Sequence, residues 1–139
     1  MKIIGFAAFA LAALATSAWA QEPQPDCENP VTQMDMNICA GEDFSKADEA
    51  LNAVYRKVMA AMRDTDAELK EMSPDLVGAA DALKKAQRAW IDYRDGHCEL
   101  AGFEARGGSM EPMLISGCMA ELTQARTKEL QALLGDDSE

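Results

Sequence analysis

The stretch Ala86–Cys98, AQRAWIDYRDGHC, constrains the fold of this chain more than any other part of the sequence. In an α-helix, Gln87, Trp90 and Arg94 stand at positions i, i+3 and i+7 and therefore share one face. A guanidinium on a face that also carries a large apolar ring needs an acidic partner, because an unpaired buried charge is strongly destabilising. We therefore expect another helix to present a carboxylate to Arg94.

The stretch that supplies this carboxylate begins at Asp48, which shares a helix face with residues four and seven positions further on. If the two helices pack together, Asp48 pairs with Arg94, two amides complete the hydrogen bonds, and an indole covers the pair. The expected structural polar cluster is Asp48, Asn52, Tyr55, Gln87, Trp90 and Arg94. The alternative is that these residues form a ligand site, which requires an open cleft over Trp90.

Residues 1–20, MKIIGFAAFALAALATSAWA, have the features of a signal peptide. Lys2 precedes an apolar run, and Ala18 and Ala20 match the A-x-A pattern of signal peptidase, which predicts cleavage after Ala20. The apolar run is shorter than the roughly 20 residues of a transmembrane helix. The first cysteine is Cys27, so we expect no lipid anchor at the cleavage point. We expect a soluble periplasmic or secreted protein without a stable membrane anchor.

The four cysteines are Cys27, Cys39, Cys98 and Cys118. In an exported protein they predict two disulfides, for which three connectivities are possible. The spacing favours the local pairs Cys27–Cys39 and Cys98–Cys118, and each would add about 3 kcal/mol of stability in the chain-entropy model. A metal site is not expected, because the sequence has no C-x-x-C pair and His97 beside Cys98 lacks zinc-ligand spacing.

After an extended, proline-containing lead-in at residues 21–30, the apolar spacing is helical to the end of the domain, and no stretch shows sustained β-type alternation. Thr32 is suited to cap a short first helix, which we expect to break near Gly41. We expect a long helix from Ser45 to about Arg63, followed by a chain reversal within residues 64–74.

A second long helix, capped by Ser73 or Asp75, should end within residues 98–102. Ser109 should cap a third helix that Gly135 ends. The predicted fold is all-α: three main antiparallel helices with a short N-terminal helix and two disulfides. It forms a single domain over residues 21–135, followed by an acidic tail at 136–139.

The formal net charge of −11 argues against nucleic acid and anionic membrane as partners and favours basic molecules. His97 could act as a general base and Ser109 as a nucleophile, but no motif relates them. Ser109 already has a role as a helix cap. We therefore predict that the protein is not an enzyme and holds no cofactor.

Several motifs together resemble the LprI-like family, which is named for a lysozyme inhibitor. They are Cys27, Thr32 and Cys39, then D-x-x-L-N-x-x-Y at 48–55, Q-x-x-W-x-x-x-R-D-x-x-C at 87–98, G-G-S at 107–109 and C-x-x-x-x-T-x-x-R at 118–126. The resemblance runs from Cys27 to about Leu130. It implies a small exported helical domain and the inhibition of lysozyme by protein–protein contact.

An acidic inhibitor would gain association rate by electrostatic steering toward a basic lysozyme. The glycine-containing turn before the third helix is the expected contact, because glycines allow close backbone approach and an arginine can pair with a catalytic carboxylate. The expected contact residues are Arg106, Gly107, Gly108, Ser109 and Met110. The alternative is a cell-envelope binding or scaffold module that has another partner and does not inhibit lysozyme.

Overall fold

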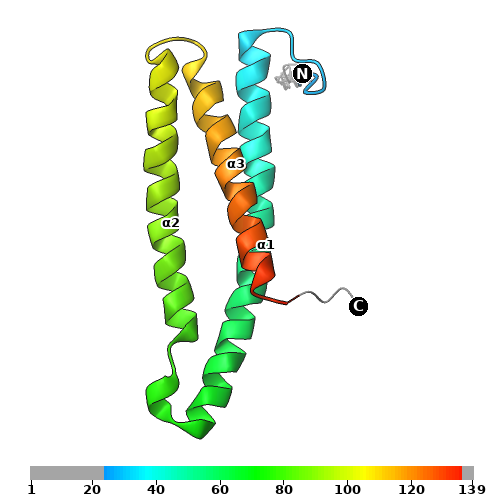
Figure 1. The fold of residues 1–139 in the computed structure, drawn as a ribbon. Helices are drawn as coiled ribbons and strands as arrows, with labels where there is room; N and C mark the ends of the chain where they lie inside the picture. The colour runs from blue at the N-terminus through cyan, green and yellow to red at the C-terminus, as the bar shows by residue number, and fades with distance from the viewer. Residues whose placement is uncertain (1–23, 136–139) are drawn as a thin grey trace, which may run out of the picture.

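The computed structural model describes residues 24–135, which form three long helices (Figure 1). They are α1 (Gln33–Met72), α2 (Ala79–Gly102) and α3 (Glu111–Ala132), with short 3₁₀ helices η1 (Pro74–Leu76) and η2 (Phe103–Ala105) in the turns. No strand occurs in these residues, and the predicted all-α fold with three main helices is confirmed. The expected signal peptide and acidic tail lie outside the described residues.

Helix α1 begins where the sequence predicts. The backbone N–H of Asp35 donates to Thr32 Oγ1 and the N–H of Thr32 donates to Asp35 Oδ2, each at 3.1 Å, so that both ends of a capping box are made. The side chains of Thr32 and Asp35 therefore satisfy backbone donors that the first helical turn leaves free.

Helix α1 is one continuous helix of 40 residues, so the predicted break near Gly41 is wrong. Ser45 does not cap a new helix, since its hydroxyl donates to the Gly41 carbonyl at 3.0 Å within the same helix. The predicted end near Arg63 is also too early. The acidic residues that follow are acceptable helix formers, and the helix stops only before Pro74, which restricts the backbone of the residue preceding it.

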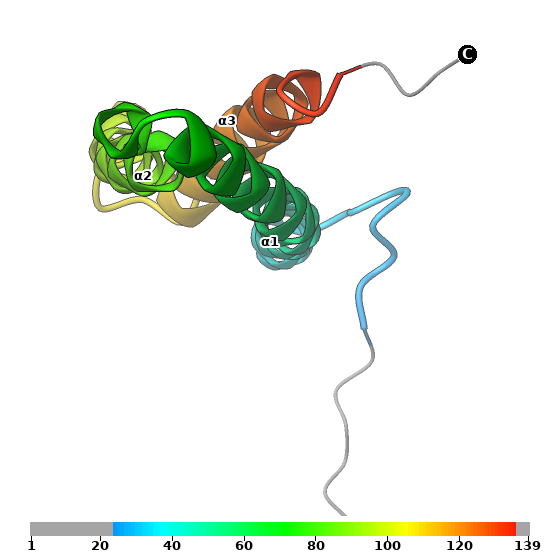
Figure 2. The same cartoon turned by 90° about the horizontal axis from the view of Figure 1, so that it is seen from below.

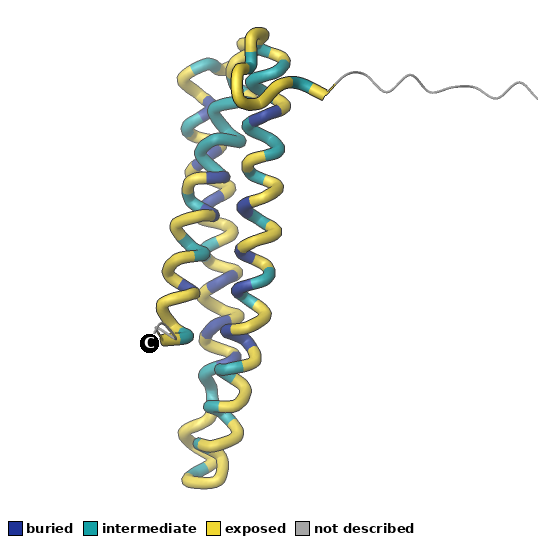
Figure 3. The backbone as a smooth tube through the Cα atoms, turned by 90° about the vertical axis from the view of Figure 1, so that its right-hand side faces the viewer, coloured by how far each residue is buried: buried dark blue, intermediate teal, exposed yellow. Residues whose placement is uncertain are grey.

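The three helices lie side by side, with α2 antiparallel to both α1 and α3 (Figures 1 and 2). Leu130 of α3 packs against the part of α1 that supplies most of the core. The buried core consists of Leu51, Val54, Val58 and Met59 of α1, Ala80 and Leu83 of α2, and Leu130. Figure 3 shows that α1 and α2 continue beyond the end of α3 as a mainly exposed two-helix hairpin.

The turn at the tip of this hairpin uses an unexpected helix cap. Asp66 of α1 accepts hydrogen bonds from the backbone N–H groups of Gly78, Ala79 and Ala80 at 2.8, 2.7 and 3.0 Å. These bonds lower the pKa of the Asp66 carboxyl below its ordinary value. The prediction that Ser73 or Asp75 caps α2 is therefore wrong, because a residue distant in sequence performs that function.

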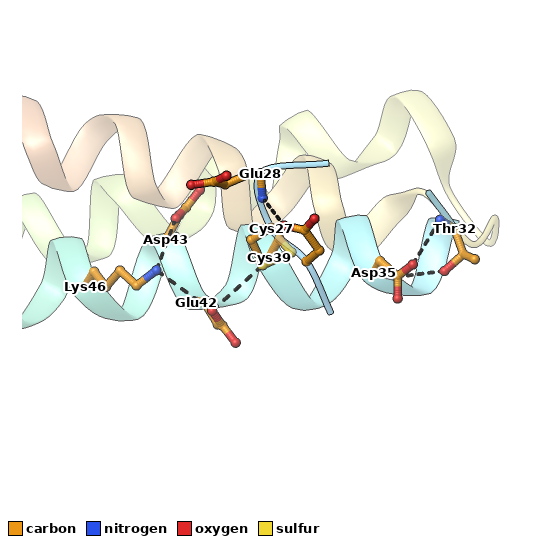
Figure 4. Close-up of a disulfide and its surroundings, with 9 residues drawn as sticks. Cys27, Glu28, Thr32, Asp35, Cys39, Glu42, Asp43 and Lys46 are labelled. Carbon is orange, nitrogen blue, oxygen red and sulfur yellow. Dashed lines mark hydrogen bonds and ion pairs between the residues drawn. A yellow bond between two sulfur atoms is a disulfide. The ribbon is translucent and has the colours of Figure 1, made fainter. Parts of the chain in front are cut away.

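Both predicted disulfides are confirmed, and they lie toward the same end of the bundle. Cys27–Cys39 ties the segment before α1 to that helix, as Figure 4 shows, and Cys98–Cys118 joins α2 to α3. Cys98 is fully buried, whereas Cys27 is exposed. The same end contains the turn between α2 and α3, and Cys98–Cys118 links the two helices that flank this turn.

Candidate functional site

Arg94 is the buried cation at the centre of the bundle, with 7% of its surface exposed. Its guanidinium carbon lies 5.2 Å from the Phe44 ring centroid and 5.1 Å from that of Trp90, so two aromatic rings contact it. Phe44 comes from α1 and Trp90 from α2. The sequence does not predict the contact between Phe44 and Arg94, because only the packing of α1 on α2 brings the two side chains together.

Three polar side chains bind this guanidinium. Arg94 Nη1 lies 3.4 Å from Asp48 Oδ1 and 3.4 Å from Thr123 Oγ1, and Arg94 Nε donates to Asp95 Oδ1 at 2.8 Å. The Asp48 contact joins α2 to α1, and the contact with fully buried Thr123 joins α2 to α3. Arg94 therefore connects all three helices.

Gln87 was predicted to complete the hydrogen bonds around Asp48 and Arg94, but it binds a different arginine. Its side-chain Oε1 accepts from Arg126 Nε of α3 at 3.2 Å. Arg126 also donates to Glu129, and its guanidinium carbon lies 6.0 Å from the Trp90 ring centroid. Two arginines therefore lie near the Trp90 ring, and the second of them, Arg126, is the arginine of the motif C-x-x-x-x-T-x-x-R, which was not part of the predicted cluster.

A groove of about 390 Å³ lies between α1 and α2, on the outer side of this polar network. Its walls combine two cations with amide, hydroxyl and aliphatic groups. The lining residues are Asn52, Tyr55, Lys84, Gln87, Arg88 and Ile91. Trp90 does not line it, so the open cleft lies over Gln87 and not over Trp90 as the ligand-site alternative required.

Asn52 and Tyr55 thus lie at the boundary between the network and the groove. Asn52 Nδ2 donates to Asp48 Oδ2 at 2.8 Å, while Tyr55 packs against the hydrophobic core at its partly buried side. Of the six residues of the predicted polar cluster, Asp48, Asn52 and Arg94 are joined by polar contacts, and the Trp90 ring lies against Arg94 as predicted. Gln87 is held by α3 instead, and no hydrogen bond of Tyr55 occurs within residues 24–135.

The turn between α2 and α3 projects from the end of the bundle and is exposed from Arg106 to Met110. Arg106 is not free: its guanidinium stacks on Phe103 at 4.5 Å, and its Nη1 donates to Glu111 Oε1 at 2.7 Å. The Gly107 N–H donates to Glu111 Oε2 at 2.7 Å. This backbone hydrogen bond and the Arg106 guanidinium lower the pKa of the Glu111 carboxyl.

Ser109 does not cap α3, contrary to the prediction. The N-cap residue is Met110, which makes no side-chain cap bond, and the helix begins at Glu111 with Pro112 in its first turn. Ser109 instead contributes its backbone carbonyl, which accepts from Asn37 Nδ2 of α1 at 2.9 Å. This bond ties the turn to the start of α1, so the turn is held at its middle as well as at its ends.

No hydrogen bond or ion pair joins the residues considered for catalysis within residues 24–135. His97 is exposed and stacks on Tyr93 with 5.4 Å between ring centroids. Within residues 24–135, neither the His97 ring nor the Ser109 hydroxyl makes a hydrogen bond or ion pair, and no group of three metal-ligating acidic, histidine or cysteine side chains occurs. In the same residues no helix has the length and hydropathy to cross a membrane.

Comparisons with known proteins give a consistent result. The model of a family described as "Lysozyme inhibitor LprI" matches residues 14–130. An uncharacterized protein of Rhizobium meliloti (strain 1021) is 64% identical over 115 residues, which cover 83% of each chain. The uncharacterized protein YecT of Escherichia coli (strain K12) is 30% identical over 115 residues, covering 76% of this chain and 70% of YecT.

One solved structure has the same fold. The crystal structure of a DUF1311 family protein from Pseudomonas putida KT2440 superposes with a TM-score of 0.62 at 21% sequence identity. The match covers 76% of this chain and 97% of that protein. The arrangement of three helices is therefore shared with a solved structure that is distant in sequence.

Proposed function

This chain belongs to the LprI family, and from that premise we propose that it is an exported protein that inhibits lysozyme by binding to it. The two disulfides favour an oxidising compartment such as the periplasm or the extracellular space. The formal net charge of −11 would steer the protein toward a basic enzyme.

The observation that best supports this function is the preorganised turn from Phe103 to Met110. Its backbone is held by Glu111, by Asn37 and by the nearby disulfide Cys98–Cys118, while its surface stays exposed. A contact loop that is ordered before binding loses less conformational entropy in the complex. Rigid projecting turns are therefore suited to enter the cleft of an enzyme.

The role of Arg106 differs from the one expected from sequence. Glu111 already forms an ion pair with Arg106, so a carboxylate of the enzyme would have to compete with Glu111 for the Arg106 guanidinium. Its stacking on Phe103 keeps the guanidinium plane fixed at the surface. Phe103, which is 53% exposed, would then contribute apolar contact area beside the charge.

The test is a turbidity assay of peptidoglycan lysis by several lysozymes, with the oxidised mature protein in molar excess. We expect a lower lysis rate for at least one lysozyme, with inhibition that weakens at higher salt because steering is screened. Arg106→Ala should weaken inhibition without lowering the melting temperature. The matched control is Arg63→Ala, an exposed arginine of the distant hairpin that should inhibit normally.

Unchanged lysis for every lysozyme tried would overturn this function and favour the alternative, a cell-envelope binding module with another partner. Inhibition that Arg106→Ala leaves intact would place the contact surface elsewhere and refute the role of the turn. A loss of fold in Arg106→Ala would show instead that the pair with Glu111 is structural.

A further inference from the structure

We propose that the groove between α1 and α2 is a binding site for a small hydroxylated carboxylate, such as a sugar acid. Its volume of about 390 Å³ lies within the range of roughly 300–1,000 Å³ that is usual for small-molecule sites. The residues that line it are not those of the projecting turn. This site is therefore separate from the surface proposed to contact lysozyme.

The main observation is the orientation of Gln87, which is 92% buried, since 8% of its surface is exposed. Arg126 has only donors, so the side-chain oxygen of Gln87 must face Arg126 and the amide nitrogen must face away from it. This nitrogen has no partner among the described residues. Every fully buried side-chain nitrogen and oxygen in these residues has a hydrogen-bond partner, so the unpartnered Gln87 Nε2 cannot be fully buried. Because Gln87 lines the groove, we infer that Nε2 faces the groove.

Two cations flank this fixed donor. Lys84 and Arg88 line the same groove, in a protein whose formal net charge is −11. Lys84 pairs with the exposed Asp81 at 3.0 Å, an exposed ion pair that a ligand could displace. Arg88 makes no ion pair within residues 24–135. A carboxylate would thus meet one oriented amide donor and two positive charges.

The remaining walls favour a ligand that also carries hydroxyl groups. Asn52 uses its nitrogen to bind Asp48, which leaves its oxygen as an acceptor for a hydroxyl. Tyr55 offers a phenol, and Ile91, 38% exposed, offers an apolar wall. The groove therefore offers a hydrogen-bond acceptor, a hydroxyl group and an apolar wall beside its two cations, a combination that suits a sugar ring with one carboxylate.

The test is titration of the oxidised protein with glucuronate, N-acetylmuramate and neutral glucose, followed by NMR of the Gln87 side-chain amide. We expect saturable shifts with the two acids and none with glucose. Tighter binding of N-acetylmuramate would assign the ligand to the cell wall, and equal binding would indicate sugar acids in general. No saturable shift with either acid, or equal binding of glucose, would overturn the proposal.

Two variants locate the site. Gln87→Glu keeps the acceptor for Arg126 but turns the groove-facing donor into a carboxylate oxygen, so we expect about tenfold weaker binding or more without a lower melting temperature. Lys84→Met should weaken binding several-fold, whereas its neighbour Lys85→Met, an equal charge change outside the groove, should not. Equal losses in the two lysine variants, or full binding by Gln87→Glu, would refute the site. Lysozyme takes no part in these measurements, so their failure is distinguishable from failure of the proposed function.

Discussion

The two ends of this bundle are held together in different ways. The end with the projecting turn has three helices, both disulfides and a capping box at Thr32. The opposite end has only α1 and α2, and from Ala60 to Ala79 no residue is buried. There the turn depends on one carboxylate, Asp66, which receives three backbone N–H groups.

This difference shows how a small domain can extend beyond its core. Past the end of α3, α1 and α2 have few apolar side chains to bury, so hydrophobic burial cannot fix their separation. A carboxylate placed at the N-terminus of α2 satisfies its free amides and interacts favourably with the helix dipole. We therefore expect the end with the two disulfides to unfold only when the whole molecule unfolds, and the hairpin end to unfold locally.

Removal of the Cys98–Cys118 disulfide should have the largest effect. The double variant Cys98→Ala with Cys118→Ala should lose about 3 kcal/mol of unfolding free energy, because the bridge closes a long loop and Cys98 is fully buried. Urea denaturation measures this loss. The control is Cys27→Ala with Cys39→Ala, whose shorter loop and exposed Cys27 predict a smaller loss; the reverse order would contradict our comparison.

Arg94→Ala should be the next most destabilising change. It removes the one side chain that, within residues 24–135, bonds to both Asp48 of α1 and Thr123 of α3, and it leaves a space next to the rings of Phe44 and Trp90. The expected loss is about 2 to 3 kcal/mol in urea denaturation. Arg94→Met keeps most of the packing and should lose less. A fully stable Arg94→Ala protein would show that the cation does not join the helices.

Two glycines of α2 should respond in opposite directions. A Cβ at Gly102 would lie 2.6 Å from Ile115 Cγ1 of α3, so Gly102→Ala should cost about 1 to 3 kcal/mol of stability. At Gly96 nothing lies within 4 Å, and Gly96→Ala should add about 0.5 to 1 kcal/mol through helix propensity. Thermal unfolding of both variants tests whether α2 packs tightly on α3 at Gly102 and leaves open space at Gly96.

Asp66→Asn should have the smallest global effect and a clear local one. We expect the amides of Gly78, Ala79 and Ala80 to lose hydrogen-exchange protection several-fold, while the amides of the core keep theirs. The control is Asp64→Asn, an exposed neighbour that caps nothing in the described residues. Equal loss of protection across all three helices would show that the hairpin does not open separately.

The same carboxylate predicts a pH dependence. The backbone N–H groups hold the pKa of Asp66 below its ordinary value, so folding favours the ionised form. Its contribution is fully present above the ordinary pKa of about 4 and is lost as the pH falls through the lower folded value. Protection at the N-terminus of α2 should therefore fall on acidification in the native protein and change little in Asp66→Asn.

Much of the fold follows from local patterns in the sequence. The helical spacing predicted three main helices, and the separation of the cysteines favoured both disulfide pairs. The end of α1 was placed too early because its last turns are dense in Asp and Glu and carry only Leu69 and Met72 as large apolar side chains. Helix propagation continues through such residues until Pro74 interrupts it.

The candidate site was predicted less completely. Helical register placed Asp48 opposite Arg94, and their side chains lie 3.4 Å apart. Register could not reveal that Thr123 also contacts Arg94, because the position of α3 along α1 depends on packing. For the same reason Gln87 was assigned to the wrong arginine, and the groove that it lines does not lie over Trp90, where the ligand-site alternative required a cleft.

The sequence by itself determined where helices form, which cysteines are near neighbours and which family the chain resembles. These properties depend on residues a few positions apart, or on motifs that can be matched one by one. Only the tertiary structure decided that Gln87 turns its free amide into a groove, that Glu111 occupies Arg106, and that Asp66 caps α2. Each depends on the distance between side chains of different helices or turns, which the packing of the whole bundle sets.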